Sequence, residues 1–257
     1  MKNNFLNKLL IVAAIGLTAT SCNKDFLTEN LTTARTTDFY KTDAGIQQLS
    51  VGAQYQTFDV PFNGEWIYCA MNYGTDEFRI GGDPSNAPWN NYDATFGPTV
   101  VASNGNTAMS NYQWDALYTA VGDANLLIEN ASKSTSSNAA IKVALGEGYF
   151  MRAYNYLRLV SQYGGVPLQL TPINTVKTEF ARATAKDVYA QIIADFKAAI
   201  PLLPVAGAPA KITQDAANHF LAKAYLSRAS EINSSWNSDT KAADLAAIGP
   251  LCDQVIA

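Results

Sequence analysis

The residues best suited to bind a ligand lie in a glycine-rich stretch at positions 73–96, YGTDEFRIGGDPSNAPWNNYDATF. Neutral sugars present apolar C–H faces that stack on aromatic rings, and hydroxyl groups that bond to planar polar side chains. This stretch supplies both kinds of partner, and its candidate ligand-binding residues are Asp76, Arg79, Trp89, Asn90, Asn91 and Tyr92. Two alternatives stay open: the rings pack the stretch against a scaffold, or Arg79 pairs with Asp76 or Glu77 as a loop staple.

The sequence carries no pattern of catalytic or metal-binding residues. Its single histidine, His219, precedes Phe220 in a helical pattern and is interpreted as a structural or surface residue. There is no G-x-S-x-G motif and no Cys/His metal spacing. Asp76 and Glu77 are neighbours in the chain, which does not indicate the facing carboxylates of a glycosidase, although such pairs can come from distant positions. We therefore expect no catalytic residue, no cofactor and no metal ion.

The first 21 residues have the pattern of a secretion signal. Lys2 and Lys8 form its positive segment, and positions 9–17 form an apolar run that is too short to span a bilayer. Small residues then lead to Cys22 in LTATSC, which resembles a bacterial lipoprotein box. We expect residues 1–21 to be a lipoprotein signal peptide and Cys22 to carry the lipid. The alternative is ordinary signal cleavage that leaves a free thiol.

Residues 22–42 form the expected lipidated tether. The segment Asn23-Lys24-Asp25 directly follows Cys22, and its charged pair resembles the surface-export signal of Bacteroidota lipoproteins. Several acyl chains would make membrane attachment stable. The net charge of −4 and the pI near 5.0 argue against a nucleic-acid-binding surface. Cys69 and Cys252 could form a disulfide in an oxidising compartment, and two buried free thiols are an equally good alternative.

Helical periodicity dominates the rest of the chain, and its strongest pattern is EGYFMRAYNYLRLVSQYGGVPL at positions 147–168. One apolar stripe consists of Gly146, Phe150, Ala153, Leu157 and Val160, and a second consists of Tyr149, Tyr156 and Tyr163. The polar residues on the remaining strip are Asn155, Arg158 and Gln162. A helix with two apolar stripes must be covered on more than one side. Gly164-Gly165 and Val166-Pro167 are expected to end it.

Polar residues at suitable positions predict where other helices begin. These starts are Thr42, the capping box Ser110-x-x-Gln113, Thr184-x-x-Asp187, Thr213 and a position near Lys241. Asn125 falls on the apolar face of the helix after Ser110 and is expected to be a hydrogen-bonded core amide. Residues 61–109 show no sustained period but contain many aromatic residues, so we expect an ordered, irregular loop.

A shift of 71 residues (146 to 217) superposes two of these helices. It aligns Gly146-x3-Phe150-x2-Ala153 with Ala217-x3-Leu221-x2-Ala224, and both resemble the second helix of a tetratricopeptide repeat. Small residues there let two helices approach closely. The sequence predicts a mainly α fold: a tetratricopeptide-like helical-hairpin scaffold with long irregular loop insertions. The last pattern still runs at Ala257, so residues 43–257 are expected to form a helical domain that is incomplete at its C-terminus.

Several segments resemble a known family in the same order along the chain. They are SCNKDFLTEN, WDALYTAVGDANLLIENA, RAYNYLRLVSQYGGVPL, DVYAQIIADFKAAIPLLP and KITQDAANHFLAKAYLSRA. Together they extend from position 22 to about 230, and the YGGVPL ending and the LP pair after an amphipathic helix are the most specific features. The family is the SusD/RagB family of outer-membrane nutrient-binding lipoproteins of Bacteroidota.

This resemblance implies a function without catalysis. Members are lipid-anchored at the cell surface, bind oligosaccharides or, in some cases, peptides, and deliver them to a TonB-dependent outer-membrane transporter. The region at positions 73–96 contributes ligand contacts in members of the family, but no motif transfers the contact residues. The alternative that we retain is a helical-repeat scaffold that binds only peptide or protein partners. No nucleic-acid partner is expected.

Overall fold

The structure, a computed structural model, describes residues 36–60, 72–79, 81, 87–91, 107–207 and 211–256. All elements within these ranges are helical, and the packing discussed below lies within residues 38–257. The elements are η2 (Phe39–Lys41), α2 (Asp43–Gln54), η3 (Tyr55–Asp59), α4 (Ala87–Asn91), α6 (Thr107–Lys133), α7 (Ala139–Tyr163), α8 (Ala185–Ala199), η6 (Ile200–Leu202), α9 (Gln214–Ala229), η7 (Glu231–Asn233) and α10 (Lys241–Ile256). The mainly α prediction is confirmed.

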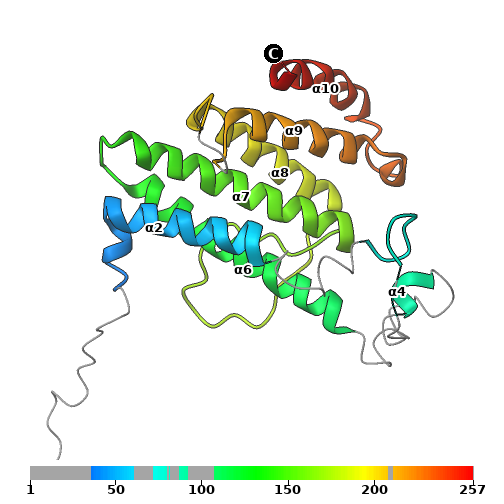
Figure 1. Cartoon of the computed structure of the whole chain (residues 1–257), viewed down its shortest axis with the longest axis horizontal. Coiled ribbons are helices and arrows are strands. Elements are labelled where there is room, and N and C mark those ends of the chain that lie inside the picture. Colours follow the sequence, from blue (N-terminus) through cyan, green and yellow to red (C-terminus); the bar gives the residue numbers. More distant parts are fainter. Residues whose placement is uncertain are drawn as a thin grey trace, which may run out of the picture. The chain divides into compact units, whose positions relative to one another are not determined.

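Helices α6 to α10 pack side by side in chain order, as Figure 1 shows. Helix α6 packs on α7, α7 on α8, α8 on α9, and α9 on α10, while α2 lies against both α6 and α7. This succession of helix pairs is the predicted tetratricopeptide-like arrangement. It makes α7 the central helix, because α2, α6, α8, α9 and η6 all contact it.

Three of the predicted helix starts are confirmed in atomic detail. The side-chain oxygen of Thr42 accepts a hydrogen bond from the backbone N–H of Gly45, that of Thr184 from Asp187, and that of Thr213 from Ala216. Each bond satisfies one of the backbone donors that a helix leaves unpaired at its first turn. Helix α10 also begins at Lys241, as predicted.

The prediction of a capping box at Ser110 is wrong. Helix α6 begins at Thr107, so position 110 lies inside the helix rather than before it. Gln113, which the capping box would use to reach back to the start, is buried, and its Nε2 has no hydrogen-bond partner. The residues before Ser110 join the helix and move its start upstream. The predicted loop 61–109 therefore contains the start of α6 and the short helix α4.

Helix α7 is covered even more completely than its two apolar stripes predict. Phe150 and Tyr156 are among the largest fully buried side chains, and the polar Asn155 and Arg158 are buried as well. The predicted end of the helix is confirmed: Gly164 takes a φ of 69°, which favours glycine. At Gly165, a Cβ atom would lie 2.3 Å from the carbonyl oxygen of Ala183, so a side chain there would collide with the returning chain.

Small residues allow close packing at the contacts of α7. A Cβ atom added to Gly146 would lie 2.9 Å from Cβ of Leu202 in η6, and one added to Gly148 would lie 2.9 Å from Cγ1 of Ile128 in α6. Ala217 and Ala224, which match Gly146 and Ala153 in the 71-residue shift, are fully buried in α9. Both halves of the predicted repeat thus use small residues where helices meet.

Other expectations of the sequence have mixed outcomes. Cys252 is an exposed free thiol on α10, so the alternative of two buried thiols is wrong for this residue. Cys69 and the amino-terminal segment with Cys22 lie outside the described residues. His219 is exposed, with its ring 5.1 Å from that of Phe220. Within the ranges that the structure covers, no helix is long and apolar enough to cross a membrane.

Candidate functional site

A cavity of about 730 Å³ lies between α6 and the extended connection that follows α7. We call it the α6 cavity. Its lining residues are Trp114, Tyr118, Val121, Gly122, Leu126, Pro167, Gln169, Thr171, Pro172, Ile173, Asn174, Thr178 and Phe180. None of these side chains carries a charge. The volume is in the range of small-molecule sites, which are mostly apolar with a few placed polar groups.

The aromatic part of the lining comes from one face of α6. Trp114 and Tyr118 are four residues apart, so their side chains are neighbours on the helix surface, and their ring centroids are 4.8 Å apart. Tyr163 at the end of α7 forms a T-shaped pair with Trp114, with ring centroids 5.0 Å apart and an interplanar angle of 85°. These contacts hold the two lining rings in fixed positions.

The tyrosine hydroxyl groups behind the cavity act as hydrogen-bond donors. Tyr118 donates to the carbonyl of Pro167 at 2.8 Å, which joins α6 to the connection. Burial raises the pKa of the Tyr118 hydroxyl far above its ordinary value, with the nearby Tyr156 adding to the effect. Burial also raises the pKa of Tyr156 to about 12. Both groups therefore keep their protons at physiological pH and add no charge to the site.

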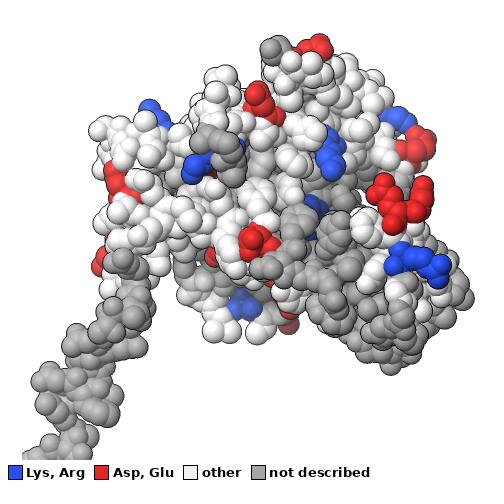
Figure 2. Space-filling view, viewed as in Figure 1, with Lys and Arg blue, Asp and Glu red and all other residues white. Residues whose placement is uncertain are grey.

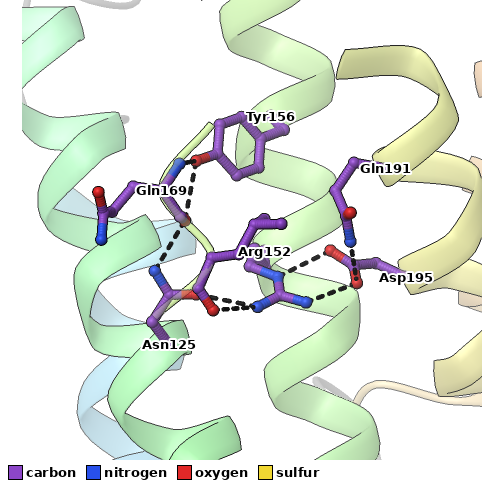
Figure 3. Close-up of polar contacts among 7 residues, drawn as sticks. Asn125, Arg152, Tyr156, Gln169, Gln191 and Asp195 are labelled. Atoms are coloured by element: carbon purple, nitrogen blue, oxygen red, sulfur yellow. Dashed lines mark hydrogen bonds and ion pairs between the residues drawn. The ribbon is translucent and has the colours of Figure 1, made fainter. Parts of the chain in front are cut away.

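The wall of the cavity is an extended segment without regular structure, and side chains hold its backbone (Figure 3). The hydroxyl of Tyr156 donates to the carbonyl of Gln169 at 2.9 Å and accepts from its backbone N–H at 2.6 Å. The same carbonyl accepts from Nδ2 of Asn125 at 2.9 Å. Asn125 is buried, so the prediction of a hydrogen-bonded core amide is confirmed.

Arg152 on α7 connects this wall to α8 (Figure 3). Its Nε and Nη2 donate to the two carboxylate oxygens of Asp195 at 2.8 and 2.7 Å. Its Nη1 donates to Oδ1 of Asn125 and to the carbonyl of Leu170, both at 3.0 Å. Gln191 donates to the same carboxylate at 2.9 Å. All three nitrogens of the guanidinium therefore donate hydrogen bonds. Because the charges of Arg152 and Asp195 cancel, the buried ion pair adds no net charge behind the cavity.

The sequence analysis missed this network. One residue in the sequence could have indicated the network. Asp195 is a charged residue that directly precedes Phe196 and follows Ile192 by three positions, on the inward stripe of α8. A carboxylate in such a position needs a buried cation nearby. The position of the partner, Arg152, depends on how α7 packs on α8 and is not encoded in local spacing.

The outer rim of the cavity is formed by exposed apolar residues of the connection. Ile173 is 54% exposed and Phe180 38%, although both line the cavity. Nζ of Lys177 lies 4.6 Å from the centre of the Phe180 ring, a cation–π contact that partly shields this ring. On the opposite wall, Gly122 leaves space that a larger side chain would fill, because nothing lies within 4 Å of its missing Cβ.

The structure describes the side chains of four of the six candidate residues. Asp76 and Arg79 are exposed in a segment that turns at Gly74, and Asn91 is exposed at the end of α4, where Nδ2 of Asn90 donates to its Oδ1 at 3.4 Å. Arg79 forms no ion pair with Asp76 or Glu77, so the alternative of a loop staple is not seen in this described turn. Asp76, Arg79, Asn90 and Asn91, whose side chains the structure describes, do not line the α6 cavity. The backbone of Trp89 belongs to α4, but its side chain and all of Tyr92 lie outside the described residues.

The chemistry of the described site is that of binding. Its lining offers ring faces, amides and hydroxyls, and no nucleophile paired with a base. Among the residues that the structure covers, no group of three or more His, Cys, Asp or Glu side chains could hold a metal ion. Stacked helix pairs that carry an uncharged, partly aromatic cavity define this part of the chain as a helical-repeat protein.

The chain belongs to the SusD-like family. The family model described as "Starch-binding associating with outer membrane" matches residues 68–226. A curated relative, SusD-like protein P2 of Formosa agariphila, is 29% identical over 121 residues, which cover 45% of this chain and 23% of that protein. The resemblance to the SusD/RagB family is therefore confirmed.

Solved structures share the fold. A SusD superfamily protein from Parabacteroides distasonis matches with a TM-score of 0.67 at 17% identity, covering 86% of this chain and 45% of its own. A laminarin-binding SusD-like protein matches with a TM-score of 0.62 at 23% identity, and the match covers 81% of this chain and 44% of that protein. A crystal structure with xylogluco-oligosaccharide matches with a TM-score of 0.60 at 22% identity, and the match covers 82% of this chain and 40% of that protein. The chain thus spans less than half the length of these relatives, and the likeness establishes the fold.

Proposed function

We propose that this chain is part of a cell-surface lipoprotein that captures oligosaccharides and delivers them to a TonB-dependent outer-membrane transporter. Its signal peptide would be residues 1–21, its lipid anchor Cys22 and its tether residues 22–42. No bond is made or broken in this role: the protein binds the glycan and the partner transports it. Membership of a family described as starch-binding and outer-membrane-associated supports the proposal.

The observation that carries the proposal is the uncharged lining of the α6 cavity. A neutral sugar has no charge to strip of its hydration on entering such a site, whereas an anionic ligand would need a buried cation to compensate for the lost hydration. The visible face of the molecule is mostly uncharged, with scattered charged groups and a cluster of acidic and basic groups at its right edge (Figure 2). Two proteins of the same fold are described with laminarin and with xylogluco-oligosaccharide.

Binding would combine stacking and hydrogen bonds. The apolar face of a sugar ring would lie against Trp114, Tyr118 or Phe180. Its hydroxyls would bond to the polar side chains of the lining, which are Gln169, Thr171, Asn174 and Thr178. A further set of contacts remains proposed for the upstream segment, at Asp76, Arg79, Trp89, Asn90, Asn91 and Tyr92.

A cavity-filling substitution tests the site. Gly122→Leu places a side chain in open space that faces the cavity, and we expect it to weaken the binding of laminari-, xylogluco- or malto-oligosaccharides by at least about tenfold in calorimetric titrations. Gly52→Leu is the matched control, because Gly52 is an exposed helical glycine with nothing within 4 Å of its missing Cβ and does not line the cavity. Equal affinities for the two variants would exclude the α6 cavity as the glycan site.

A second candidate function is a scaffold that binds only peptide or protein partners. The exposed apolar residues of the connection after α7 favour it, since Leu170, Ile173, Val176 and Phe180 are all accessible to another protein. Titration with purified transporter and with the same oligosaccharides separates the two functions. Binding to the transporter with no response to any glycan would support the scaffold, and turnover of a bound glycan would indicate an enzyme.

A further inference from the structure

The chain between α7 and α8 leaves the scaffold and returns to it at the same place. The backbone N–H of Ala183 donates to the carbonyl of Val166 at 3.0 Å. Arg182 adds to this closure, because its Nε donates to the carbonyl of Gly165 at 2.7 Å. Residues 167–182 therefore form a loop whose two ends are joined, which is the arrangement of an Ω-loop. We call this segment the wall loop, because it forms one wall of the α6 cavity.

Contacts within the wall loop help to set its shape. Nε2 of Gln169 donates to the carbonyl of Thr171 at 2.6 Å, and Nζ of Lys177 lies over the ring of Phe180. A loop that is fixed at both ends and stiffened by its own side chains loses less conformational freedom on binding a ligand than a free segment would. The wall loop can therefore present side chains to the α6 cavity in a defined arrangement.

The polar side chains that the helices direct toward the wall loop are engaged in holding it (Figure 3). The hydroxyls of Tyr118 and Tyr156 donate to backbone carbonyls of the loop. The amide of Asn125 donates to the carbonyl of Gln169 and accepts from Arg152. These hydrogen bonds use groups that could otherwise bond to a ligand. Hydrogen bonds to a sugar must therefore come mainly from elsewhere in the lining.

The wall loop carries polar side chains that are not engaged in this way. Thr171, Asn174 and Thr178 all line the α6 cavity, and all three are exposed. In the part of the chain that the structure describes, none of these side chains forms a hydrogen bond with another residue. Their hydroxyl and amide groups can both donate to and accept from the hydroxyls of a sugar.

The α6 cavity thus divides two kinds of contact between two elements. The ring faces of Trp114 and Tyr118 belong to α6, whereas the polar groups that are free to bond belong to the wall loop. Stacking uses apolar C–H faces that many sugars share. A hydrogen bond to a hydroxyl depends on where that hydroxyl lies on the sugar ring. Sites built to hydrogen-bond a hydroxyl also reject analogues that lack it much more strongly than apolar pockets do.

We infer that Thr171, Asn174 and Thr178 select which neutral sugar the α6 cavity binds, while Trp114 and Tyr118 hold sugar rings of several kinds. This role rests on the proposed capture of oligosaccharides and adds to it the element that sets their identity. Substitutions in the wall loop change the ratio of affinities between sugars, and substitutions on the face of α6 change the affinity for all of them.

A panel of neutral oligosaccharides of equal length tests this division of roles. Cello-, manno- and xylo-oligosaccharides share one linkage and differ in their ring substituents, and laminari- and malto-oligosaccharides differ from the first in linkage alone. In calorimetric titrations, we expect Asn174→Ala and Thr178→Ala each to weaken the sugar that the wild type binds most tightly by at least about tenfold, and the other sugars by less than about threefold. The matched controls are Asn111→Ala on α6 and Thr175→Ala in the wall loop, two exposed residues that do not line the cavity.

A further variant distinguishes the two elements. Trp114→Phe keeps a smaller ring and is expected to weaken every sugar of the panel by a similar factor. Equal losses for all sugars in Asn174→Ala and Thr178→Ala, or no loss in either, would overturn the role of the wall loop and leave oligosaccharide capture standing. Equal affinity of the wild type for all sugars would do the same. A wild type that binds no sugar of the panel would overturn both, and urea titrations check that each variant is folded.

Discussion

Arg152 and Asp195 form a two-pronged ion pair in which both side chains are nearly inaccessible to water, at 7% and 4% exposure. The pair joins the central helix α7 to α8, and the third nitrogen of the guanidinium reaches the wall of the α6 cavity. A buried pair offers little net stability over an apolar replacement, because both charges lose their hydration. Its geometry specifies how α7, α8 and the wall fit together.

Removing one member of this pair should be costly. We expect Arg152→Ala to lower the free energy of unfolding by about 3–5 kcal/mol in urea titrations, because Asp195 is left as a buried, uncompensated charge. Lys186→Ala is the matched control: it breaks an ion pair with Asp239 whose side chains are 50% and 58% exposed, and it should cost less than about 1 kcal/mol. Similar losses for both variants would show that the buried pair has no special role.

The hydroxyl of Tyr118 should stabilise the wall without supplying the ring face. Tyr118→Phe keeps the ring but removes the donor to the Pro167 carbonyl, so we expect a loss of about 1 kcal/mol in the free energy of unfolding. Tyr112→Phe removes an exposed hydroxyl of the same helix and should change it by less than about 0.5 kcal/mol. If Tyr118→Phe is as stable as the control, this bond does not hold the wall.

Glu147 should make stability depend on pH. Burial raises the pKa of its carboxyl, against hydrogen bonds from Ser50 and Gln54 and the charge of Lys211, which lower it. Between the ordinary value of 4.5 and the raised native value, the folded state binds more protons than the unfolded chain. The neutral Glu147 carboxyl therefore contributes its full stabilisation below the ordinary pKa of a glutamate. This contribution is lost as pH rises through the pKa that Glu147 has in the folded protein.

Glu147→Gln removes this titration. Its free energy of unfolding should fall less than that of the wild type between about pH 4 and about pH 7, which urea titrations at several pH values would measure. Glu179→Gln, at an exposed position in the connection after α7, controls for the loss of one carboxylate. Parallel pH profiles of the wild type and Glu147→Gln would refute the prediction.

The upstream segment carries a separate prediction. If Trp89 stacks on the sugar, Trp89→Ala should weaken oligosaccharide binding about tenfold or more and leave the helical fold intact. Tyr112→Ala removes a ring that is 45% exposed on α6 and outside the α6 cavity, so it serves as the control for loss of a surface aromatic. Unchanged affinity for the true ligand would remove Trp89 from the site.

The sequence predicted the ends of helices well where they depend only on neighbouring residues. Thr184 and Thr213 cap the helices they precede, and Gly164 ends α7, because each effect involves only neighbouring residues. Ser110 shows the limit of the same rule. A capping pattern does not prevent the residues before it from joining the helix, and α6 begins at Thr107.

The candidate site was less accessible to prediction. The α6 cavity combines residues of α6 with residues of the connection after α7, and the pattern of neither segment indicates which faces meet. The aromatic pair Trp114 and Tyr118 packs against the hydrophobic core, as helical spacing predicts, but that spacing does not reveal the open space beside the two rings. The predicted contacts at Asp76 and Arg79 followed residue chemistry alone and remain predictions.

The connection after α7 has two unequal halves. Side chains of the helices hold the backbone at Pro167, Gln169 and Leu170, whereas in residues 172–181 the described structure contains no hydrogen bond to the scaffold. Substitutions, insertions or deletions in the second half would therefore reshape the rim of the α6 cavity without disturbing the helices. This makes residues 172–181 the natural place to randomise in a library that selects for new ligands.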